Sequence, residues 1–508
     1  MHCSRTDVSR RAGRAFERPR GAVELAWLGV LAALALAVGL CAAVAGDDDE
    51  PLSSSAHAEI RRLPPNPQEL GDPARGLRYL LHGDYLGSGL PVELWKRLVP
   101  QPDLHPATLE LAEAKLRDNS IPSMPYDTTR FVTGEGADVI GGVNCLGCHA
   151  SMFRGELVIG LGNSLRDWTT DGPEPTALAI AGAASFAPGS AESRAMTRFV
   201  RGARVLHGKT RAPFRGLNPA FRIEEVAAAH RVPETLAWSA EPLYDVPDRV
   251  IASDVPPWWH IKKKHGLYYN GMGGGDYAKL LQQIGVVMIE DQRDAERITE
   301  GMRDLMAFLF TIEPPAYPWA IDADLAEVGR AVFENDCASC HGTYGRGRGD
   351  DWTYPNALVP IGIVGTDPEY ARILKESALP GWYGKSWYAM AGRAEGEPPA
   401  SYAEPELAYI APPLDGIWAS APYFHNGSVP TLDAVLDSSL RPTLWKRSFR
   451  DDDYDPDRVG WRYTVPETAD GPETYDTRVR GYSAGGHTFG DDLTDAERRA
   501  VLEYLKGL

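Results

Sequence analysis

The chain has 508 residues, of which 43% are hydrophobic, and a formal net charge of -18 at pH 7. Such acidity argues against nucleic acid or an anionic membrane surface as the partner, because both are bound by basic patches. The length allows two or three hydrophobic cores, and the 51 glycines and 40 prolines predict helices joined by long ordered loops.

The first 45 residues have the pattern of an export segment. An arginine-rich start is followed by an uncharged apolar run from Leu25 to Ala45, and the small residues 43–45 fit a cleavage site. The run is also long enough to span a bilayer. We therefore expect residues 1–45 to be a signal peptide or a membrane anchor through residues 25–45. The protein would be periplasmic or extracellular, or anchored to the inner membrane.

Residues 46–135 contain no haem motif and are interpreted as an N-terminal wrapping segment. A short helix is predicted there, because Asp72 is a good N-cap and Pro73 fits the first turn. We expect this helix to run to about His82, followed by loops rich in glycine and proline.

The pentad Cys-x-x-Cys-His occurs twice, at 145–149 and at 337–341. In this spacing two thiols can reach the two vinyl groups of one porphyrin, while the adjacent imidazole binds the iron. A zinc site would need further Cys or His nearby, and neither pentad has them. The other two cysteines lie in the export segment. We therefore predict two covalently bound c-type haems, attached through Cys145, Cys148, His149, Cys337, Cys340 and His341.

Three further helices are predicted around the second pentad. Apolar residues at helical spacing mark Arg293–Phe310, and a second periodic stretch runs from Leu325 through Phe333 into Cys337. A capping box at Thr494 begins a closing helix. Within the second stretch, Gly329 offers a place where another helix can approach closely. The approach to the first pentad is broken by glycines, so a less regular entry is expected there.

The proline-rich stretch at 313–318 separates the two pentads and is interpreted as a linker. We expect a first haem domain at 136–313 and a second, cytochrome c-like haem domain at 314–508. Each pentad is followed at nearly equal separation by a helix carrying an aromatic-Leu pair, which is typical of a duplication. The predicted fold class is mainly α, with two cytochrome c-like haem domains, long ordered loops and little sheet.

The axial iron ligands decide what each haem can do. A haem that only transfers electrons normally has both axial positions filled, whereas activation of a small molecule needs an open or displaceable position. For the second haem we prefer His487, in a glycine-flanked loop, with His425 as the alternative. The first haem has no histidine between His149 and His207, so its distal position is predicted to be open. The candidate histidines outside the pentads are His57, His82, His105, His207, His230, His260, His265, His425 and His487.

The two pentads, together with the segments 411–418 (Ala-Pro-Pro-Leu-Asp-Gly-Ile-Trp) and 421–432, resemble the di-haem cytochrome c peroxidase superfamily. The segments 144–150, 160–163 and 256–264 are more similar to its rubber-oxygenase branch. The resemblance implies a reactive amino-terminal haem and a six-coordinate, electron-transferring carboxy-terminal haem. It also implies a Ca2+ ion between the domains, although no acidic loop requires one.

The sequence departs from the peroxidase pattern at two places. No histidine follows His149 within range, and 432–440 contains no methionine to bind the second iron. Both departures favour an oxygenase-like site. In the rubber oxygenases the second haem has a distal histidine, which suits His487. Trp258 and Trp259, beside three lysines, are interpreted as candidate catalytic residues that line the reactive haem or relay electrons. The alternative is a buried aromatic pair beside a solvated basic turn.

The leading hypothesis is an exported di-haem oxidoreductase in which the first haem activates O2 or peroxide and the second transfers electrons. One alternative is a cytochrome c peroxidase that consumes H2O2 and takes electrons from a small external redox protein. Another is a non-enzymatic electron carrier with both haems six-coordinate, which a ligand such as His260 or Met272 on the first iron would support. The sequence does not identify the organic substrate.

Overall fold

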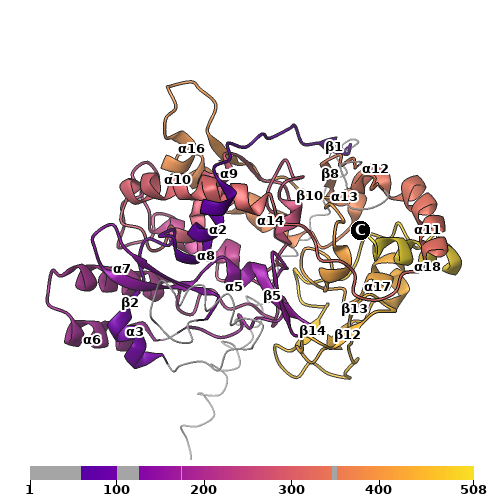
Figure 1. The fold of residues 1–508 in the computed structure, drawn as a ribbon, viewed down its shortest axis with the longest axis horizontal. Coiled ribbons are helices and arrows are strands. Elements are labelled where there is room, and N and C mark those ends of the chain that lie inside the picture. The colour runs from indigo at the N-terminus through magenta and orange to yellow at the C-terminus, as the bar shows by residue number, and fades with distance from the viewer. Residues whose placement is uncertain (1–58, 100–124, 173, 346–351) are drawn as a thin grey trace, which may run out of the picture. The chain divides into compact units, whose positions relative to one another are not determined.

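A computed structural model describes residues 59–508, apart from 100–124, 173 and 346–351 (Figure 1). The predicted export segment and the candidate histidines His57 and His105 lie outside these residues. Within the described part of the chain, no helix is long and apolar enough to cross a membrane.

Helices are more abundant than strands in the described residues. The α-helices, in chain order, are α2 (Pro73–His82), α3 (Val92–Leu98), α5 (Leu146–His149), α6 (Pro175–Ser185), α7 (Ala191–Leu206), α8 (Ala220–Ala229), α9 (Tyr277–Leu280), α10 (Gln292–Leu309), α11 (Ala323–Asp336), α12 (Ala338–His341), α13 (Ile361–Val364), α14 (Glu369–Glu376), α15 (Leu379–Tyr383), α16 (Trp387–Met390), α17 (Leu432–Leu436) and α18 (Asp495–Leu505). Short 3-10 turns are η1 (Trp258–His260), η2 (Leu281–Gly285), η3 (Ile417–Ala419) and η4 (Ser438–Leu440).

The strands are short, and all their pairings are antiparallel. They are β1 (Arg61–Arg62), β2 (Leu90–Pro91), β3 (Thr128–Val132), β4 (Asp138–Val143), β5 (Ala150–Phe153), β6 (Glu156–Ile159), β7 (Gly273–Gly275), β8 (Ala357–Pro360), β9 (Ser401–Ala403), β10 (Ala408–Ile410), β11 (Leu444–Lys446), β12 (Tyr454–Asp455), β13 (Gly460–Trp461) and β14 (Thr474–Asp476). They form two three-stranded sheets, β1-β8-β10 and β2-β4-β3, and the pairs β5-β6, β7-β9, β11-β14 and β12-β13.

The four helices predicted from the sequence are confirmed. Helix α2 begins after Asp72, whose side chain accepts the Arg75 amide, and α10 and α11 cover the two periodic stretches. Helix α18 has the capping box, because Thr494 and Glu497 each accept the other's backbone amide. The entry to the first pentad also differs from a helix, as expected: strand β4 runs into Cys145 after one intervening residue.

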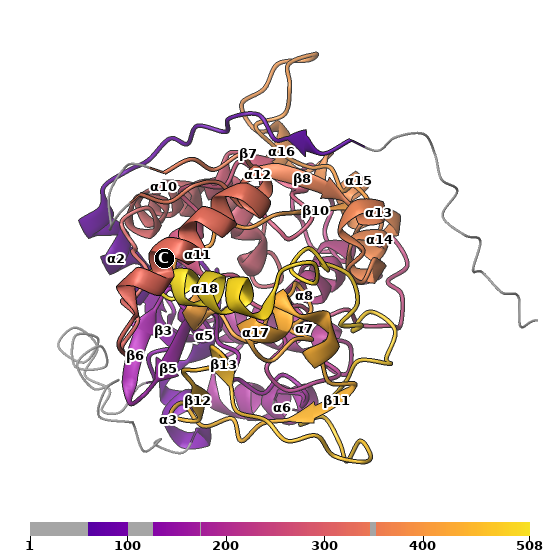
Figure 2. The same cartoon turned by 90° about the vertical axis from the view of Figure 1, so that its right-hand side faces the viewer.

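Helices α11 and α18 pack together beside the second pentad, as Figure 2 shows. A Cβ atom added to Gly329 would lie 1.8 Å from the Ala500 carbonyl oxygen, so only glycine permits this approach. The prediction of close helix packing at Gly329 is therefore confirmed. The contact brings the C-terminal helix against the helix that leads into the second pentad.

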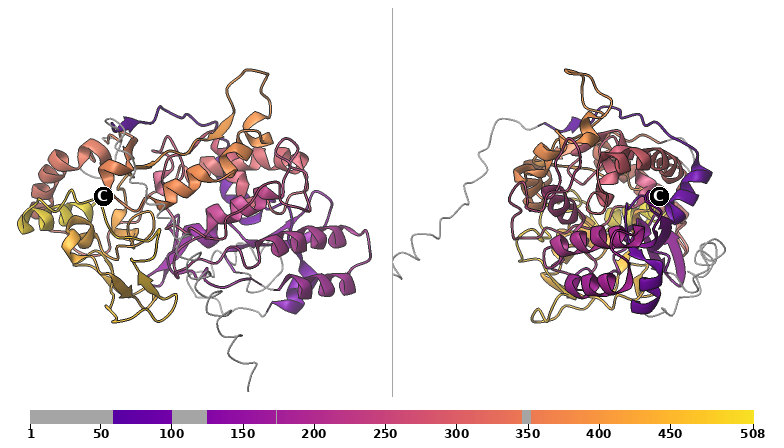
Figure 3. Two further views of the ribbon diagram at one scale, coloured as in Figure 1. Left: turned by 180° about the vertical axis from the view of Figure 1, so that it is seen from behind. Right: turned by 90° about the vertical axis from the view of Figure 1, so that its left-hand side faces the viewer.

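Secondary structure crosses the predicted domain boundary near residue 313. Strand β9 pairs with β7, and β1, near the start of the described chain, pairs with β8. Helices α15 and α16 pack on α8 and α9, and the views in Figures 1 and 3 show this orange segment beside the magenta helices. Residues 59–508 form one compact unit. The two predicted haem domains therefore share strands and helix contacts, and the division itself stays a prediction.

Candidate functional site: two Cys-x-x-Cys-His pentads and the segment between them

The first pentad is held in place by buried asparagines. Asn144 accepts the Leu146 amide through its side chain at 2.9 Å. The side-chain amide of Asn163 donates to the Gly147 carbonyl at 3.2 Å, and that of Asn218 donates to the Cys148 sulfur at 2.8 Å. These bonds fix the backbone of α5 and the direction of one thiol, because they join buried side-chain amides to the pentad's own atoms.

The imidazole of His149 is packed between a ring and a carbonyl group. The Trp258 ring stacks on it with centroids 4.9 Å apart and planes at 18°. Burial lowers the pKa of His149 to about 4, and the nearby Pro256 carbonyl partly offsets this shift. The imidazole is therefore neutral at physiological pH, which is the form that binds a metal. Its Nδ1 atom is buried and has no partner of good hydrogen-bond geometry.

The four cysteines of the pentads are free thiols in this structure. Cys145, Cys148, Cys337 and Cys340 form no disulfide. Burial raises the pKa of Cys145 to about 12, so this thiol is protonated at physiological pH in the absence of a bound group. No group of three or more His, Cys, Asp or Glu side chains converges as a metal site within the described residues. That finding also locates no Ca2+ site there.

The second pentad begins where α11 ends and α12 follows. His341 donates through Nδ1 to the Pro412 carbonyl at 2.9 Å, which orients the ring and leaves the other nitrogen for a ligand. Tyr344 donates to the His341 carbonyl at 3.0 Å and accepts the Leu414 amide at 2.6 Å. The loop that contains Pro412 therefore supports the histidine at two points.

His487 faces His341. Their ring centroids lie 6.2 Å apart, with the planes at 62°. Imidazole nitrogens bind a metal such as zinc at about 2 Å, so a metal held between two facing imidazoles would put their centroids roughly 6 Å apart. Burial lowers the pKa of His487 to about 4, and its Nδ1 is buried without a partner. The pair therefore fits the two axial positions of one haem iron.

The alternative ligand His425 lies among tyrosines. Its ring stacks on Tyr409 at 4.3 Å, and its Nε2 is 3.2 Å from the Tyr409 hydroxyl. Tyr269 and Tyr370 complete its aromatic surroundings. With Nε2 in this hydrogen bond, His425 has less freedom to bind a metal than His487.

Three of the other candidate histidines bond to backbone carbonyls. His230 bonds to Ser239, His260 to Asp415 and His265 to Leu63, through ring nitrogens at 2.8–3.0 Å. His207 is the C-cap of α7. None of these four has a ring contact with His149 in the described part of the chain, and Met272 is buried in the core.

Trp258 and Trp259 contact the surroundings of both pentads. Trp258 stacks on His149, while the Trp259 indole donates to the Asp415 carbonyl at 2.7 Å. Asp415 belongs to the loop whose Pro412 carbonyl accepts the hydrogen bond from His341. Two adjacent tryptophans therefore connect His149 of the first pentad to the loop that orients His341 of the second.

A buried ion pair fastens this connection. The Lys263 ammonium lies 2.7 and 2.8 Å from the two Asp415 carboxylate oxygens, and it lies over the rings of Tyr344 and Trp352. The lysine side chain is only 4% exposed. The alternative of a solvated basic turn holds only in part: Lys262 pairs with Glu313 near the surface, but Lys263 is a buried structural cation.

Two tyrosine-carboxyl pairs lie near the His425 cluster. Tyr268 donates to Glu224 at 2.8 Å, and Tyr269 donates to Asp254 at 3.1 Å. Burial raises the pKa of Glu224 to about 7 and that of Asp254 to about 8. Sequence reasoning missed these pairs, because isolated carboxylates and tyrosines give no spacing signal. It singled out the segments that contain Asn144 and Asn163 but not the role of these asparagines, and it missed Asn218, because only the folded backbone brings the three together at α5.

Residues 408–446 match the family described as RoxA-like, cytochrome c-like. The match follows the second pentad, includes the Ala-Pro-Pro-Leu-Asp-Gly loop, and reaches neither pentad itself. It supports a haem protein of the cytochrome c class with c-type haem as cofactor.

Two proteins of Sinorhizobium fredii (strain NBRC 101917 / NGR234) are similar in sequence, and both are named as uncharacterized. Protein y4iJ is 31% identical over 253 residues, which cover 39% of this chain and 41% of the relative. Protein y4iM is 25% identical over 268 residues, or 48% of this chain and 58% of the relative. The chain thus spans about half the length of these relatives.

A solved structure of hydrazine synthase from Kuenenia stuttgartiensis is similar at 14% identity, covering 60% of this chain and 92% of that chain. Its TM-score is 0.21, which is too low to transfer a fold or a function.

Proposed function

We propose that this protein is an exported di-haem c-type cytochrome oxidoreductase. The haem attached at Cys145, Cys148 and His149 would be the reactive centre for O2 or peroxide. The haem attached at Cys337, Cys340 and His341 would be an electron-transfer centre with His487 as its second axial ligand. The family match at 408–446 supports the cytochrome class, and the local geometry supports the division of roles.

The observation that carries this proposal is the difference between the two proximal histidines. His341 is faced by His487, with ring centroids 6.2 Å apart, whereas among the described residues no second imidazole has a ring contact with His149, on which the Trp258 indole stacks. A filled sixth position favours electron transfer, and an open one favours reaction with a small molecule. The redox chemistry would belong to the haem iron, while the chain supplies ligation, burial and orientation.

The residues around each site have definite tasks in this proposal. The neutral imidazoles of His149 and His487 are ready to bind iron without first losing a proton. The Pro412 carbonyl holds the proton on Nδ1 of His341 and so directs its other nitrogen to the metal. Trp258 and Trp259 would carry electrons between the centres, because they link both proximal sides through one short segment.

The test is a quantitative electronic and electron paramagnetic resonance spectrum of the purified ferric protein, with the haem content measured. We expect two haems per chain, one high-spin and one low-spin. Added cyanide should convert the high-spin centre and leave the other unchanged. Two low-spin centres that do not respond to partial reduction or to cyanide would overturn the reactive-site proposal and leave an electron carrier.

If the high-spin centre is found, oxygen consumption and peroxide consumption are measured separately with a chemical reductant. Turnover of peroxide that depends on an added small redox protein would identify the peroxidase alternative. Oxygen uptake coupled to loss of an organic substrate would support the oxygenase-like reading.

A further inference from the structure

The guanidinium of Arg441 holds the loop that contains His487. Arg441 belongs to none of the motifs found in the sequence. We propose that Arg441 is a positioning residue that keeps His487 in place to bind the second haem iron. This inference rests on the proposed function, because it assumes that His487 is an axial ligand.

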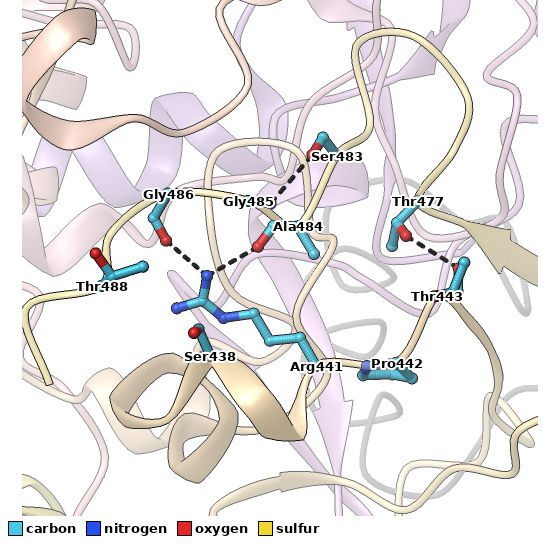
Figure 4. A pocket seen from close by; sticks show the side chains of 10 residues that line it. All are labelled: Ser438, Arg441, Pro442, Thr443, Thr477, Ser483, Ala484, Gly485, Gly486 and Thr488. Atoms are coloured by element: carbon cyan, nitrogen blue, oxygen red, sulfur yellow. Dashed lines mark hydrogen bonds between the residues drawn. The ribbon is translucent and has the colours of Figure 1, made fainter. Parts of the chain in front are cut away.

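The N–H groups of the Arg441 guanidinium donate hydrogen bonds to backbone carbonyl groups. Its Nε, Nη1 and Nη2 atoms donate at 2.6–3.2 Å to the carbonyls of Ala434, Val435, Ala484, Gly486 and His487. Figure 4 shows the guanidinium directed at the carbonyls of Ala484 and Gly486. One planar cation thus ties the end of α17 to three residues of the His487 loop, including His487 itself.

The loop needs such support because its backbone is in an unfavourable conformation. His487 has a φ of +46°, in the left-handed region that side chains other than glycine seldom adopt. Gly486 beside it has a φ of +75°, and a Cβ atom there would lie 2.0 Å from the Gly365 carbonyl carbon. Strained residues persist where surrounding bonds fix them, and they occur often at ligand-binding positions.

The same arginine also supports the ring next to His487. Its guanidinium carbon lies 5.1 Å from the centre of the Phe424 ring, and that ring lies 5.9 Å from the His487 ring. Phe424 itself has a φ of +70°. Arg441 therefore acts on the imidazole in two ways, through its backbone carbonyl and through the neighbouring aromatic ring.

A cavity of about 310 Å³ lies beside Arg441, lined by polar residues that include Ser438, Thr443 and Thr488. An arginine in such a place can mark an anion site. Here the donors are already paired with carbonyl groups, so the arrangement fits a support for the loop better than a site for a ligand.

The experiment compares Arg441→Met and Arg441→Lys with a matched control, Arg498→Met. Arg498 also donates to loop carbonyls, those of Gly490, Asp491 and Leu493, just after the His487 loop.

We expect Arg441→Met to lose most of the low-spin ferric signal of the second haem, and added imidazole to restore it. Arg441→Lys should give an intermediate signal and a shifted reduction potential, because one ammonium cannot reach all five carbonyls. Arg498→Met should keep the wild-type spectrum.

A spectrum and potential of the second haem that stay unchanged in both Arg441 variants would overturn the inference. An equal spectral change in Arg498→Met would overturn it too, because the effect would then be a general loosening of the structure.

His487→Ala separates the two proposals. If that variant keeps the low-spin signal, the assignment of His487 as ligand fails. If it loses the signal while the Arg441 variants retain it, only the role of Arg441 fails. Arg441→Lys keeps the charge and most of the volume, so it serves if Arg441→Met does not fold.

Discussion

The two pentads have the same chemistry and different surroundings. Helix α5 is enclosed, with Leu146 and Gly147 buried, and a tryptophan ring covers one side of its histidine. Helix α12 contains no buried residue, and its histidine is faced by a second imidazole. The difference teaches that the pentad determines where a haem is attached, while the residues around it determine whether the iron can react or only exchange electrons.

The largest effect should come from removing one attachment site at a time. Cys145→Ser/Cys148→Ser and Cys337→Ser/Cys340→Ser should each reduce the covalent haem from two to one per chain, because a pentad without its two thiols can form no thioether bond. Haem content is measured on the denatured protein, where noncovalent haem is lost. The low-spin ferric signal should survive in the first variant and disappear in the second. The comparison of the two sites would be wrong if either variant lost both signals.

Replacing the facing imidazole should remove the difference between the sites. His487→Ala is expected to turn the second haem from low-spin to high-spin, since alanine cannot bind iron. His425→Ala is the matched control, because that ring is held by Tyr409. Its spectrum should match the wild type. A low-spin signal lost only in His425→Ala would reverse the ligand assignment.

The helix pair beside the second pentad can be loosened without touching a ligand. Gly329→Ala places a methyl group against the Ala500 carbonyl, so we expect a loss of about 1–3 kcal/mol in unfolding free energy from overpacking. Gly362→Ala, where an added Cβ meets no atom within 4 Å, is the control and should change little. Denaturant titration followed at the haem absorbance measures both. Equal stability of the two variants would contradict the close packing of α11 and α18.

The connection between the sites is tested at Trp259. Trp259→Phe removes the hydrogen bond to the Asp415 carbonyl, which should cost about 1 kcal/mol of stability. It should also slow electron transfer between the haems in rapid-mixing reduction. Trp461→Phe removes a similar buried bond to the Ala421 carbonyl, away from Asp415, and is the control. If both variants slow the transfer equally, Trp259 is not a specific link.

The smallest effect concerns Glu224. Its pKa is raised by burial to about 7 from an ordinary value of 4.5, so between these pH values the folded protein keeps a proton that the unfolded chain has released. Stability from this group is therefore full at low pH and is lost as the pH rises through the window. Glu224→Gln should gain stability relative to the wild type between about pH 5 and about pH 8. Thermal unfolding of both proteins at several pH values measures this gain. A difference in stability between them that does not change with pH would contradict the raised pKa of Glu224.

The sequence by itself determined the local features of this protein. The two pentads follow from spacing alone, and α2, α10, α11 and α18 follow from apolar periodicity and capping residues, because these signals depend on neighbours within a few turns of the chain. The close approach at Gly329 was also visible, since glycine marks such contacts before the partner helix is known.

The sequence already preferred His487 to His425 for the second haem and named Trp258 as a residue that lines the reactive one, but only the tertiary structure decided which of these candidates contact each histidine. The stacking of Trp258 on His149, the facing of His487 and His341, and the bonds from Arg441 join residues separated by roughly a hundred positions or by an irregular loop. Such pairs have no period or spacing in the sequence. They arise when distant segments pack and when buried donors and carbonyl groups must find partners. The same physical requirement placed Lys263 in a buried pair, where the sequence left a solvated turn as one of two interpretations.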